Sequence, residues 1–163
     1  MKRLAILSVF AVSGLLLNSG TPFAQSAGQI VGTWADVSNL NVAKDGTQSE
    51  IFGPNPSGLV MFQPNGKFMV IYTRAGLAKF ASGNRMQGTP EENKAIVQGT
   101  FAMFGTYSLE GKTLTLKVAG GTWPSWTGTT QKAEVTFRTD DEMAYAIPNT
   151  IGGKSINTLK RVE

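Results

Sequence analysis

Apolar and polar positions alternate along most of the chain after about residue 30. In residues 30–40, small and β-branched residues alternate with Gly32, Trp34 and Asp36, a period of two that is typical of a β-strand. Segments of the same kind, bounded by turn residues, recur toward the C-terminus: 59–62, 67–73, 104–109, 112–118, 131–138, 142–147 and 155–162. About eight short strands at intervals of roughly 8–12 residues predict one mainly-β domain, a small antiparallel barrel.

The clearest hairpin joins residues 59–62 to residues 67–73. Its turn contains Asn65-Gly66, which supply the positive φ values that tight turns need. Both faces of the second strand are largely apolar. We therefore expect one face to line the barrel interior and the other to pack against a covering segment.

One short helix interrupts the strands, and its start is marked by capping residues. Thr89 is a suitable N-cap, Pro90 occupies the first helical position, and Glu92 completes a capping box. The apolar positions predict a helix that ends at about residue 102. We expect this helix to lie over one end of the barrel, with Gly99 permitting close approach, and we favour a helix that covers core over a mobile lid.

A barrel closes only if its last strand pairs with its first. Residues 155–162 are the expected partner of residues 30–40, and they carry Arg161. Because Gly32 permits close backbone approach beside Trp34, we expect the indole to lie across the barrel end and the guanidinium of Arg161 to stack on it. Such a cation–π contact contributes on the order of 0.5–2 kcal/mol. We assign Trp34 and Arg161 to barrel closure.

The composition limits the chemistry that the chain can perform. Its 163 residues are of single-domain length, and its 41% hydrophobic and 16% charged residues are typical of globular proteins. Cys and His are both absent, which excludes disulfides, thiolate nucleophiles, Cys/His zinc sites and histidine-dependent catalysis. The acidic run at 140–142 is predicted to be a solvated turn. We therefore predict no catalytic residues, no cofactor and no metal site.

Residues 1–26 have the composition of a secretory signal peptide. Lys2 and Arg3 precede an apolar run, and small and polar residues follow it. The run has about 14 residues, fewer than the ~20 that span a bilayer, and the chain has no Cys for lipid attachment. We expect a mature domain of residues 27–163 that is secreted or periplasmic and has no permanent membrane anchor after cleavage.

The basic residues do not form a pattern typical of nucleic-acid binding. The formal net charge is +4, and it falls to +2 when Lys2 and Arg3 leave with the signal peptide. The remaining Lys and Arg residues are scattered singly, without a basic patch interleaved with aromatic residues. We therefore predict no nucleic-acid partner.

The order of several short motifs resembles that of one family. In chain order the motifs are Val31-Gly32-Thr33-Trp34, Phe52-Gly53-Pro54-x-Pro56-x-Gly58, residues 66–74, Phe80-Ala81-Ser82-Gly83, Gly88-Thr89-Pro90-Glu91-Glu92, Phe104-Gly105-Thr106-Tyr107 and Pro124-x-Trp126-x-Gly128-x-x-Gln131. Together they make residues 30–162 similar to the lipocalin-like domain family of bacteria and fungi. The chain departs from the family pattern at Met61-Phe62 and at Lys132. The resemblance implies an eight-stranded antiparallel up-and-down barrel with an apolar cavity, and a barrel of this size holds one small ligand.

Six residues are candidates for ligand binding, and each also has a structural explanation. Trp123 and Trp126 are the best candidates for a cavity mouth, because their Gly/Pro-rich loop needs no indole for its own folding, although Trp126 would equally plug the loop against the barrel. Arg74 would pair with a ligand carboxylate or phenolate, or with a nearby acidic residue. The other candidates would orient a ligand through a hydroxyl or amide, or belong to the core and loops: Tyr72, Tyr107 and Gln131.

These observations lead to three functional hypotheses. We favour an exported barrel that binds an apolar or amphipathic small molecule in its interior, oriented by one or two polar groups. The first alternative is a cyclase or isomerase that shapes a small-molecule substrate and acts through Tyr or Arg electrostatics. The second is a structural or stress-related envelope protein with a filled barrel. A cavity bounded by Trp and Tyr favours binding, a deep polar group with a perturbed pKa favours catalysis, and a filled interior favours the structural role.

Overall fold

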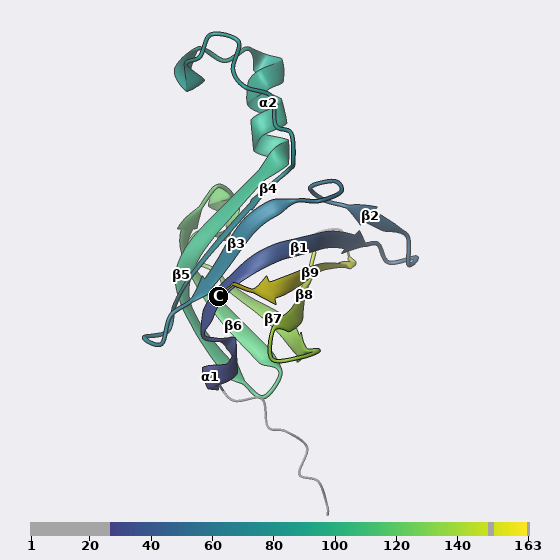
Figure 1. Cartoon of the computed structure of the whole chain (residues 1–163), viewed down its shortest axis with the longest axis vertical. Helices are drawn as coiled ribbons and strands as arrows, with labels where there is room; N and C mark the ends of the chain where they lie inside the picture. Colours follow the sequence, from purple (N-terminus) through teal and green to yellow (C-terminus); the bar gives the residue numbers. More distant parts are fainter. Residues whose placement is uncertain (1–26, 150–151, 163) are drawn as a thin grey trace, which may run out of the picture.

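The computed structural model describes residues 27–149 and 152–162, and the predicted signal peptide lies outside these residues. The described strands form one antiparallel sheet in the order β2-β1-β3-β4-β5-β6-β7-β8-β9, which a pairing of β1 with β9 closes into a barrel (Figure 1). The strands are β1 (Gly32–Val42), β2 (Gln48–Glu50), β3 (Ser57–Phe62), β4 (Lys67–Thr73), β5 (Thr100–Glu110), β6 (Thr113–Gly121), β7 (Thr130–Phe137), β8 (Glu142–Pro148) and β9 (Lys154–Arg161). The helices are α1 (Ala27–Ile30) and α2 (Pro90–Gly99), with 3₁₀ turns η1 (Arg85–Gln87) and η2 (Pro124–Trp126). None of the helices in the described ranges has the length and apolar character needed to cross a membrane.

Strand β1 is 11 residues long, so one of its edges accommodates two partners. Its first residues pair with β3 and its last three pair with the short β2, while its other edge pairs with β9 along residues 34–42. Eight strands therefore form the closed antiparallel barrel, which confirms the predicted fold, and β2 extends its rim. The sequence did not predict β2 because its three residues, QSE, include no apolar position and are all exposed.

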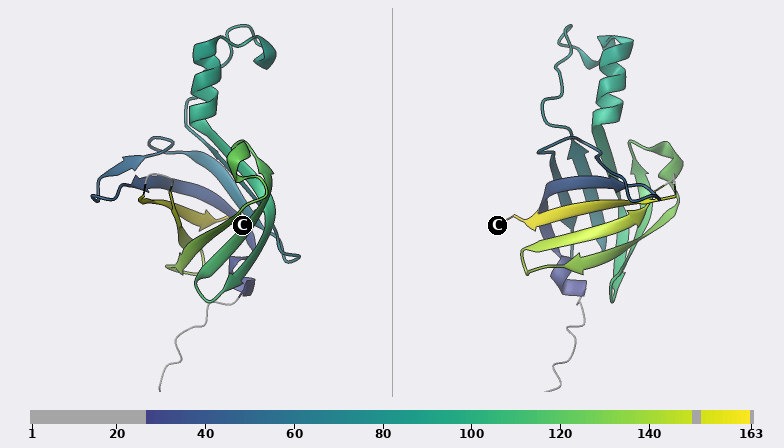
Figure 2. Two further views of the ribbon diagram at one scale, coloured as in Figure 1. Left: turned by 180° about the vertical axis from the view of Figure 1, so that it is seen from behind. Right: turned by 90° about the vertical axis from the view of Figure 1, so that its right-hand side faces the viewer.

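Alternate side chains of the strands fill the barrel interior. In β4, Phe68, Val70 and Tyr72 are buried, whereas the intervening Met69 and Ile71 are exposed. One face of this strand lines the barrel interior, as expected, and the structure shows that it is the face of Phe68, Val70 and Tyr72. The segment predicted to cover the outward face is absent from the described part of the chain, because the residues between β4 and β5 leave the barrel instead of folding back over it (Figure 2).

Helix α2 begins where the sequence predicts. The hydroxyl of Thr89 accepts a hydrogen bond from the backbone N–H of Glu92 (3.2 Å), and the Glu92 carboxylate accepts one from the backbone N–H of Thr89 (2.8 Å). The helix ends at Gly99, earlier than predicted, because Thr100 already belongs to β5 and pairs with Thr73 of β4. Residues 100–102, predicted as helical, are therefore strand.

The predicted position of α2 over one end of the barrel is wrong. The helix continues the direction of β5 and projects beyond the barrel (Figures 1 and 2). The backbone N–H of Arg74 donates to the carbonyl of Gly99 (2.7 Å), so the hydrogen bonding between β4 and β5 extends to the end of the helix and fixes its direction. Gly99 packs against Leu77 of the connecting segment, and Val97 is 74% exposed. In this position α2 neither covers the core nor closes the barrel mouth.

Candidate functional site

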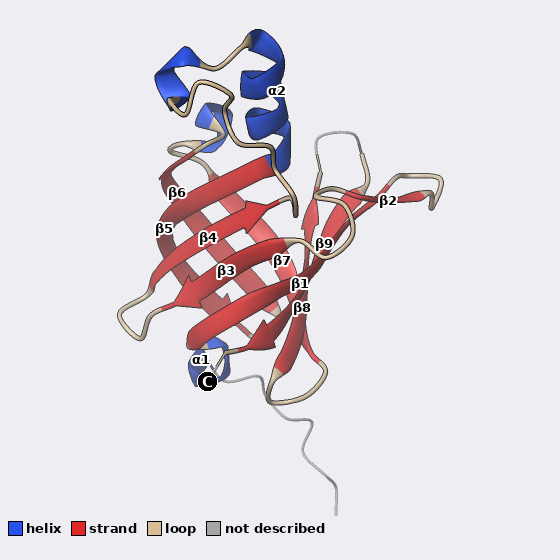
Figure 3. Cartoon of the chain, turned by 45° about the horizontal axis from the view of Figure 1, so that its top comes forward, coloured by secondary structure: helices blue, strands red, loops and turns tan. Residues whose placement is uncertain are grey.

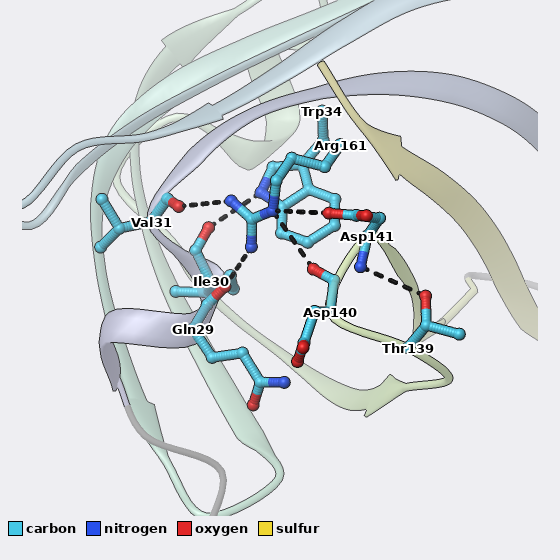
Figure 4. Close-up of polar contacts among 8 residues, drawn as sticks. All are labelled: Gln29, Ile30, Val31, Trp34, Thr139, Asp140, Asp141 and Arg161. Carbon is cyan, nitrogen blue, oxygen red and sulfur yellow. Dashed lines mark hydrogen bonds and ion pairs between the residues drawn. The ribbon is translucent and has the colours of Figure 1, made fainter. Parts of the chain in front are cut away.

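Trp34 and Arg161 close one end of the barrel (Figure 4). The Trp34 side chain is fully buried, and its indole N–H donates to the carbonyl of Ile30 (2.9 Å). The Cζ atom of Arg161 lies 4.1 Å from the centroid of the Trp34 ring, so the stacking contact predicted from the sequence is present. Gly32 has a φ of +135°, and a Cβ atom there would lie 2.7 Å from Nη1 of Arg161. This close approach explains the glycine two residues before the tryptophan.

Arg161 also satisfies main-chain carbonyls at this end. Its Nη1 and Nη2 donate to the carbonyls of Val31 (2.9 Å) and Gln29 (2.8 Å), and its Nε donates to the carbonyl of Asp140 (3.2 Å). Helix α1 lies at the same end, and α2 projects from the other (Figure 3). The residues next to α1 therefore seal the barrel, which leaves the end near α2 as the route to its interior.

A cavity of about 130 Å³ lies toward the end from which α2 projects. Its walls are aromatic and aliphatic side chains: Ile51, Phe52, Phe101, Met103, Trp123, Trp126 and Ile147. Four polar side chains complete the lining: Tyr72, Tyr145, Ser155 and Asn157. Strands β4, β5, β8 and β9 and the segments that follow β2 and β6 contribute these residues. A largely apolar pocket with a few polar groups is the usual form of a small-molecule site.

Three aromatic rings, which we call the aromatic rim, border the cavity: Phe101, Trp123 and Trp126. The two indoles are stacked, with ring centroids 4.9 Å apart and planes 12° apart. The ring of Phe101 meets Trp126 edge to face at 5.9 Å. Turn η2 places the two indoles three residues apart, the spacing at which side chains of a 3₁₀ turn eclipse. Trp123 is 40% exposed, so the rim offers a flat aromatic surface that is accessible from solvent.

Two tyrosine hydroxyls meet in the lining of the cavity. The hydroxyl oxygens of Tyr72 and Tyr145 lie 2.5 Å apart and share a hydrogen bond. Burial raises the pKa of both phenols above the ordinary value of 10.0, and the nearby Asp36 adds to the effect. Both hydroxyls therefore keep their protons at neutral pH.

Two buried asparagines connect the cavity to an acidic residue of β1. Asn39 of β1 and Asn157 of β9 are only 2% and 5% exposed, and they lie opposite each other in the pairing that closes the barrel. The amide Nδ2 of Asn39 donates both to Oδ1 of Asn157 (2.9 Å) and to Oδ1 of Asp36 (3.1 Å). We call Asp36, Asn39 and Asn157 the polar chain. It leads from the cavity lining into the barrel wall.

Asp36 is a part-buried carboxyl at the end of the polar chain that lies away from the cavity. Burial raises its pKa from the ordinary value of 3.8 to about 6, and hydrogen bonds from the Asn39 amide and the Val37 backbone oppose this only in part. Its Oδ2 atom and the Oδ1 atom of Asn39 are buried without a hydrogen-bond partner among the described residues. Burial and the unpartnered oxygen therefore both disfavour the ionised form of the Asp36 carboxyl.

The structure brings together three of the six predicted ligand-binding residues, namely Tyr72, Trp123 and Trp126, in the cavity lining. The other three do not line it. Arg74 is exposed beyond β4, where its guanidinium contacts a main-chain carbonyl at 3.5 Å. The hydroxyl of Tyr107 donates to another main-chain carbonyl (3.0 Å), and the amide of Gln131 donates to a threonine hydroxyl (2.8 Å).

Sequence reasoning missed several residues of the site: Phe52, Phe101 and Tyr145 in the lining, and all three members of the polar chain. For Asp36 the sequence did contain an indication of burial, because Asp36 lies on the same alternating face of its strand as Trp34, which is buried. The asparagines carried no comparable indication, because only the β1–β9 pairing places them opposite each other.

The chain is similar to one described family of domains, and this family agrees with the barrel fold. A family model described as a lipocalin-like domain matches residues 31–161. No curated protein matches the chain. Among solved structures, a lipocalin-like protein from Bacteroides uniformis is 19% identical, with a TM-score of 0.45 over 83% of this chain and 100% of its own. A redesigned β-barrel is 17% identical, with a TM-score of 0.45 over 88% of this chain and 100% of its own. The redesigned β-barrel mFAP1, bound to DFHBI, is 18% identical, with a TM-score of 0.43 over 83% of this chain and 97% of its own.

Proposed function

Because the chain belongs to the lipocalin-like domain family, we propose that its barrel binds an apolar or amphipathic small molecule in the cavity beside the aromatic rim. The observation that supports this most strongly is the asymmetry of the barrel. Trp34 and Arg161 seal one end, whereas a cavity with apolar walls and stacked, partly exposed indoles lies toward the other.

The size of the cavity limits the part of a ligand that it holds. Its volume of about 130 Å³ is close to that of an engineered apolar cavity of ~150 Å³ that binds benzene in another protein. The cavity therefore suits one aromatic ring or a short alkyl chain, and a longer ligand would extend over the aromatic rim. For a single-ring compound we expect a Kd on the order of 0.1–1 mM, because the burial of a few apolar atoms is partly offset by the cost of association.

One observation favours the catalytic alternative. Asp36 is an acidic group of raised pKa near the cavity, which is a common property of active sites. However, Asp36 does not line the cavity, and Asn39 and Asn157 lie between its carboxyl and the ligand position. Asp36 therefore has no direct contact with a ligand held in the cavity, and we favour binding.

The proposal includes export, which rests on the composition of residues 1–26. If these residues are a signal peptide, N-terminal sequencing of the protein from its own host will give a first residue close to Ala27. A mature protein that still begins at Met1 would contradict export.

The binding proposal predicts a specific loss of affinity in Trp126→Ala. We expect wild-type protein to bind 1-ethyl-4-fluorobenzene, and Trp126→Ala to bind it about tenfold more weakly, because a wall of the cavity and a ring contact worth about 1 kcal/mol or more are lost. A ¹⁹F NMR titration measures both affinities. Phe104→Ala is the matched control, since Phe104 is an aromatic side chain on the outer face of β5, 53% exposed and outside the cavity lining. Equal affinities of Trp126→Ala and wild type, or no binding to wild type, would contradict the proposal.

A further inference from the structure

The hydrogen bonds of the polar chain run in one direction and leave a donor at the cavity. An amide nitrogen carries two protons, and Asn39 uses both, toward Asp36 and toward the carbonyl oxygen of Asn157. Asn157 is thereby held as an acceptor at its oxygen, and its own Nδ2 group has no hydrogen-bond acceptor among the described residues. Asn157 is 5% exposed and lines the cavity. Because Asn157 lines the cavity, its free N–H₂ group is a donor for a group that enters there.

The tyrosine pair offers a second donor beside it. Tyr145 lies opposite Asn157 in the β8–β9 pairing, and its hydroxyl meets that of Tyr72. Two hydroxyls carry two protons, and the hydrogen bond between them uses only one. The other proton has no acceptor among the described residues, so it is available to a group in the cavity.

We propose that Asn157 and the Tyr72–Tyr145 pair together receive an uncharged carbonyl oxygen of the ligand, such as that of an aryl ketone, aldehyde or ester. This inference rests on the proposed binding function and specifies the ligand class. A carbonyl oxygen has two lone pairs and no proton, which matches one amide donor and one hydroxyl donor. The apolar walls and the aromatic rim then contact the rest of the molecule.

The charges around the site select against an anionic ligand. The described lining includes no charged side chain. Arg161 is engaged at the sealed end and Arg74 is exposed beyond β4, so neither guanidinium is available to pair with a carboxylate in the cavity. Asp36 lies behind the two asparagines, and a second buried negative charge near it would be repelled and poorly solvated. An uncharged acceptor avoids both costs.

The test compares three probes of similar shape by ¹⁹F NMR titration at pH 7.5. These are 4′-fluoroacetophenone, 1-ethyl-4-fluorobenzene, in which a methylene replaces the carbonyl, and 4-fluorobenzoate, which is anionic. We expect wild-type protein to bind the ketone about fivefold more tightly than the ethyl compound and to bind the benzoate most weakly, since a hydrogen bond in a buried site contributes about 1 kcal/mol.

Variants connect the preference to the proposed donors. Asn157→Leu removes the amide at similar volume, and we expect the ketone to lose its advantage while the ethyl compound binds as before. Thr158→Val, a neighbouring polar deletion outside the cavity lining, is the matched control. The double variant Tyr72→Phe/Tyr145→Phe deletes only hydroxyls, which keeps the test valid if Asn157→Leu fails to fold. The double variant is needed because either tyrosine alone still carries one free proton.

The outcomes separate the two proposals. If wild-type protein binds none of the probes, the binding function fails and the inference fails with it. If the ethyl compound binds as tightly as the ketone, or the benzoate binds most tightly, the carbonyl site is wrong while binding in the cavity stands. A ketone preference that survives both Asn157→Leu and the double tyrosine variant would also overturn the assignment of the donors.

Discussion

Replacement of Arg161 by methionine is expected to lower the free energy of unfolding by about 2–4 kcal/mol. The guanidinium donates to three main-chain carbonyls and stacks on Trp34, and its side chain is 29% exposed. Loss of the side chain leaves part-buried carbonyls without donors, at about 1 kcal/mol or more each, and removes a cation–π contact of about 1 kcal/mol. Urea unfolding followed by tryptophan fluorescence measures the change.

Two further variants distinguish the stacked guanidinium from a mere positive charge. Lys160→Met deletes an exposed cation from the same strand, and we expect a change of less than about 0.5 kcal/mol. Arg161→Lys keeps the charge but not the planar fork of donors, so we expect it to recover only a small part of the loss. If Arg161→Met is as stable as Lys160→Met, the closed end does not depend on this contact.

The second large effect is a pH dependence of stability that originates in Asp36. Burial raises the pKa of Asp36 to about 6 in the folded protein, above the ordinary value of 3.8. The folded state therefore holds this proton more tightly than the unfolded state. The stabilisation of the folded state by the protonated Asp36 carboxyl is complete below about pH 4, and it is lost as the pH rises through 6. The full difference corresponds to about 3 kcal/mol, and because the carboxyl is only part-buried we expect about 1–2 kcal/mol.

Asp36→Asn tests this origin directly. The amide is uncharged at every pH, and it supplies a donor beside Asn39, whose buried Oδ1 lacks a partner among the described residues. We expect the variant to be about 1–2 kcal/mol more stable than wild type at pH 8 and nearly equal to it at pH 4, as measured by urea unfolding at each pH. Asp45→Asn is the control, because Asp45 is exposed and its pKa is lowered by hydrogen bonds from Thr47. A constant difference between Asp36→Asn and wild type across this range would contradict the account.

The barrel was predictable because its evidence is local in the sequence. Alternation located the strands, Asn65-Gly66 located a hairpin, and Thr89 with Glu92 located the start of α2. The position of α2 was not predictable in this way. It depends on the hydrogen bond between Arg74 and Gly99, which continues a strand pairing that the sequence alone does not show.

The candidate site was predictable in its apolar part and not in its polar part. Trp123 and Trp126 are conspicuous in a Gly/Pro-rich loop, and Tyr72 lies on the inward face of a clear strand. Asn39 and Asn157 are 118 residues apart, and only the register of the β1–β9 closure places them in contact. The role that we propose for Asn157 thus depends on the strand register, which no local pattern in the sequence indicates.

The central claim, that the cavity beside the aromatic rim is the ligand site, is tested most directly by the indole N–H resonances in a ¹H–¹⁵N NMR spectrum. The chain has three tryptophans, two at the cavity and one, Trp34, at the sealed end. Trp→Phe variants assign the three signals, and 4′-fluoroacetophenone and 1-ethyl-4-fluorobenzene are then titrated in turn. The account predicts that the signals of Trp123 and Trp126 shift in a saturable manner while that of Trp34 stays in place. A shift confined to Trp34, or three signals unmoved at millimolar concentrations of both probes, would contradict it.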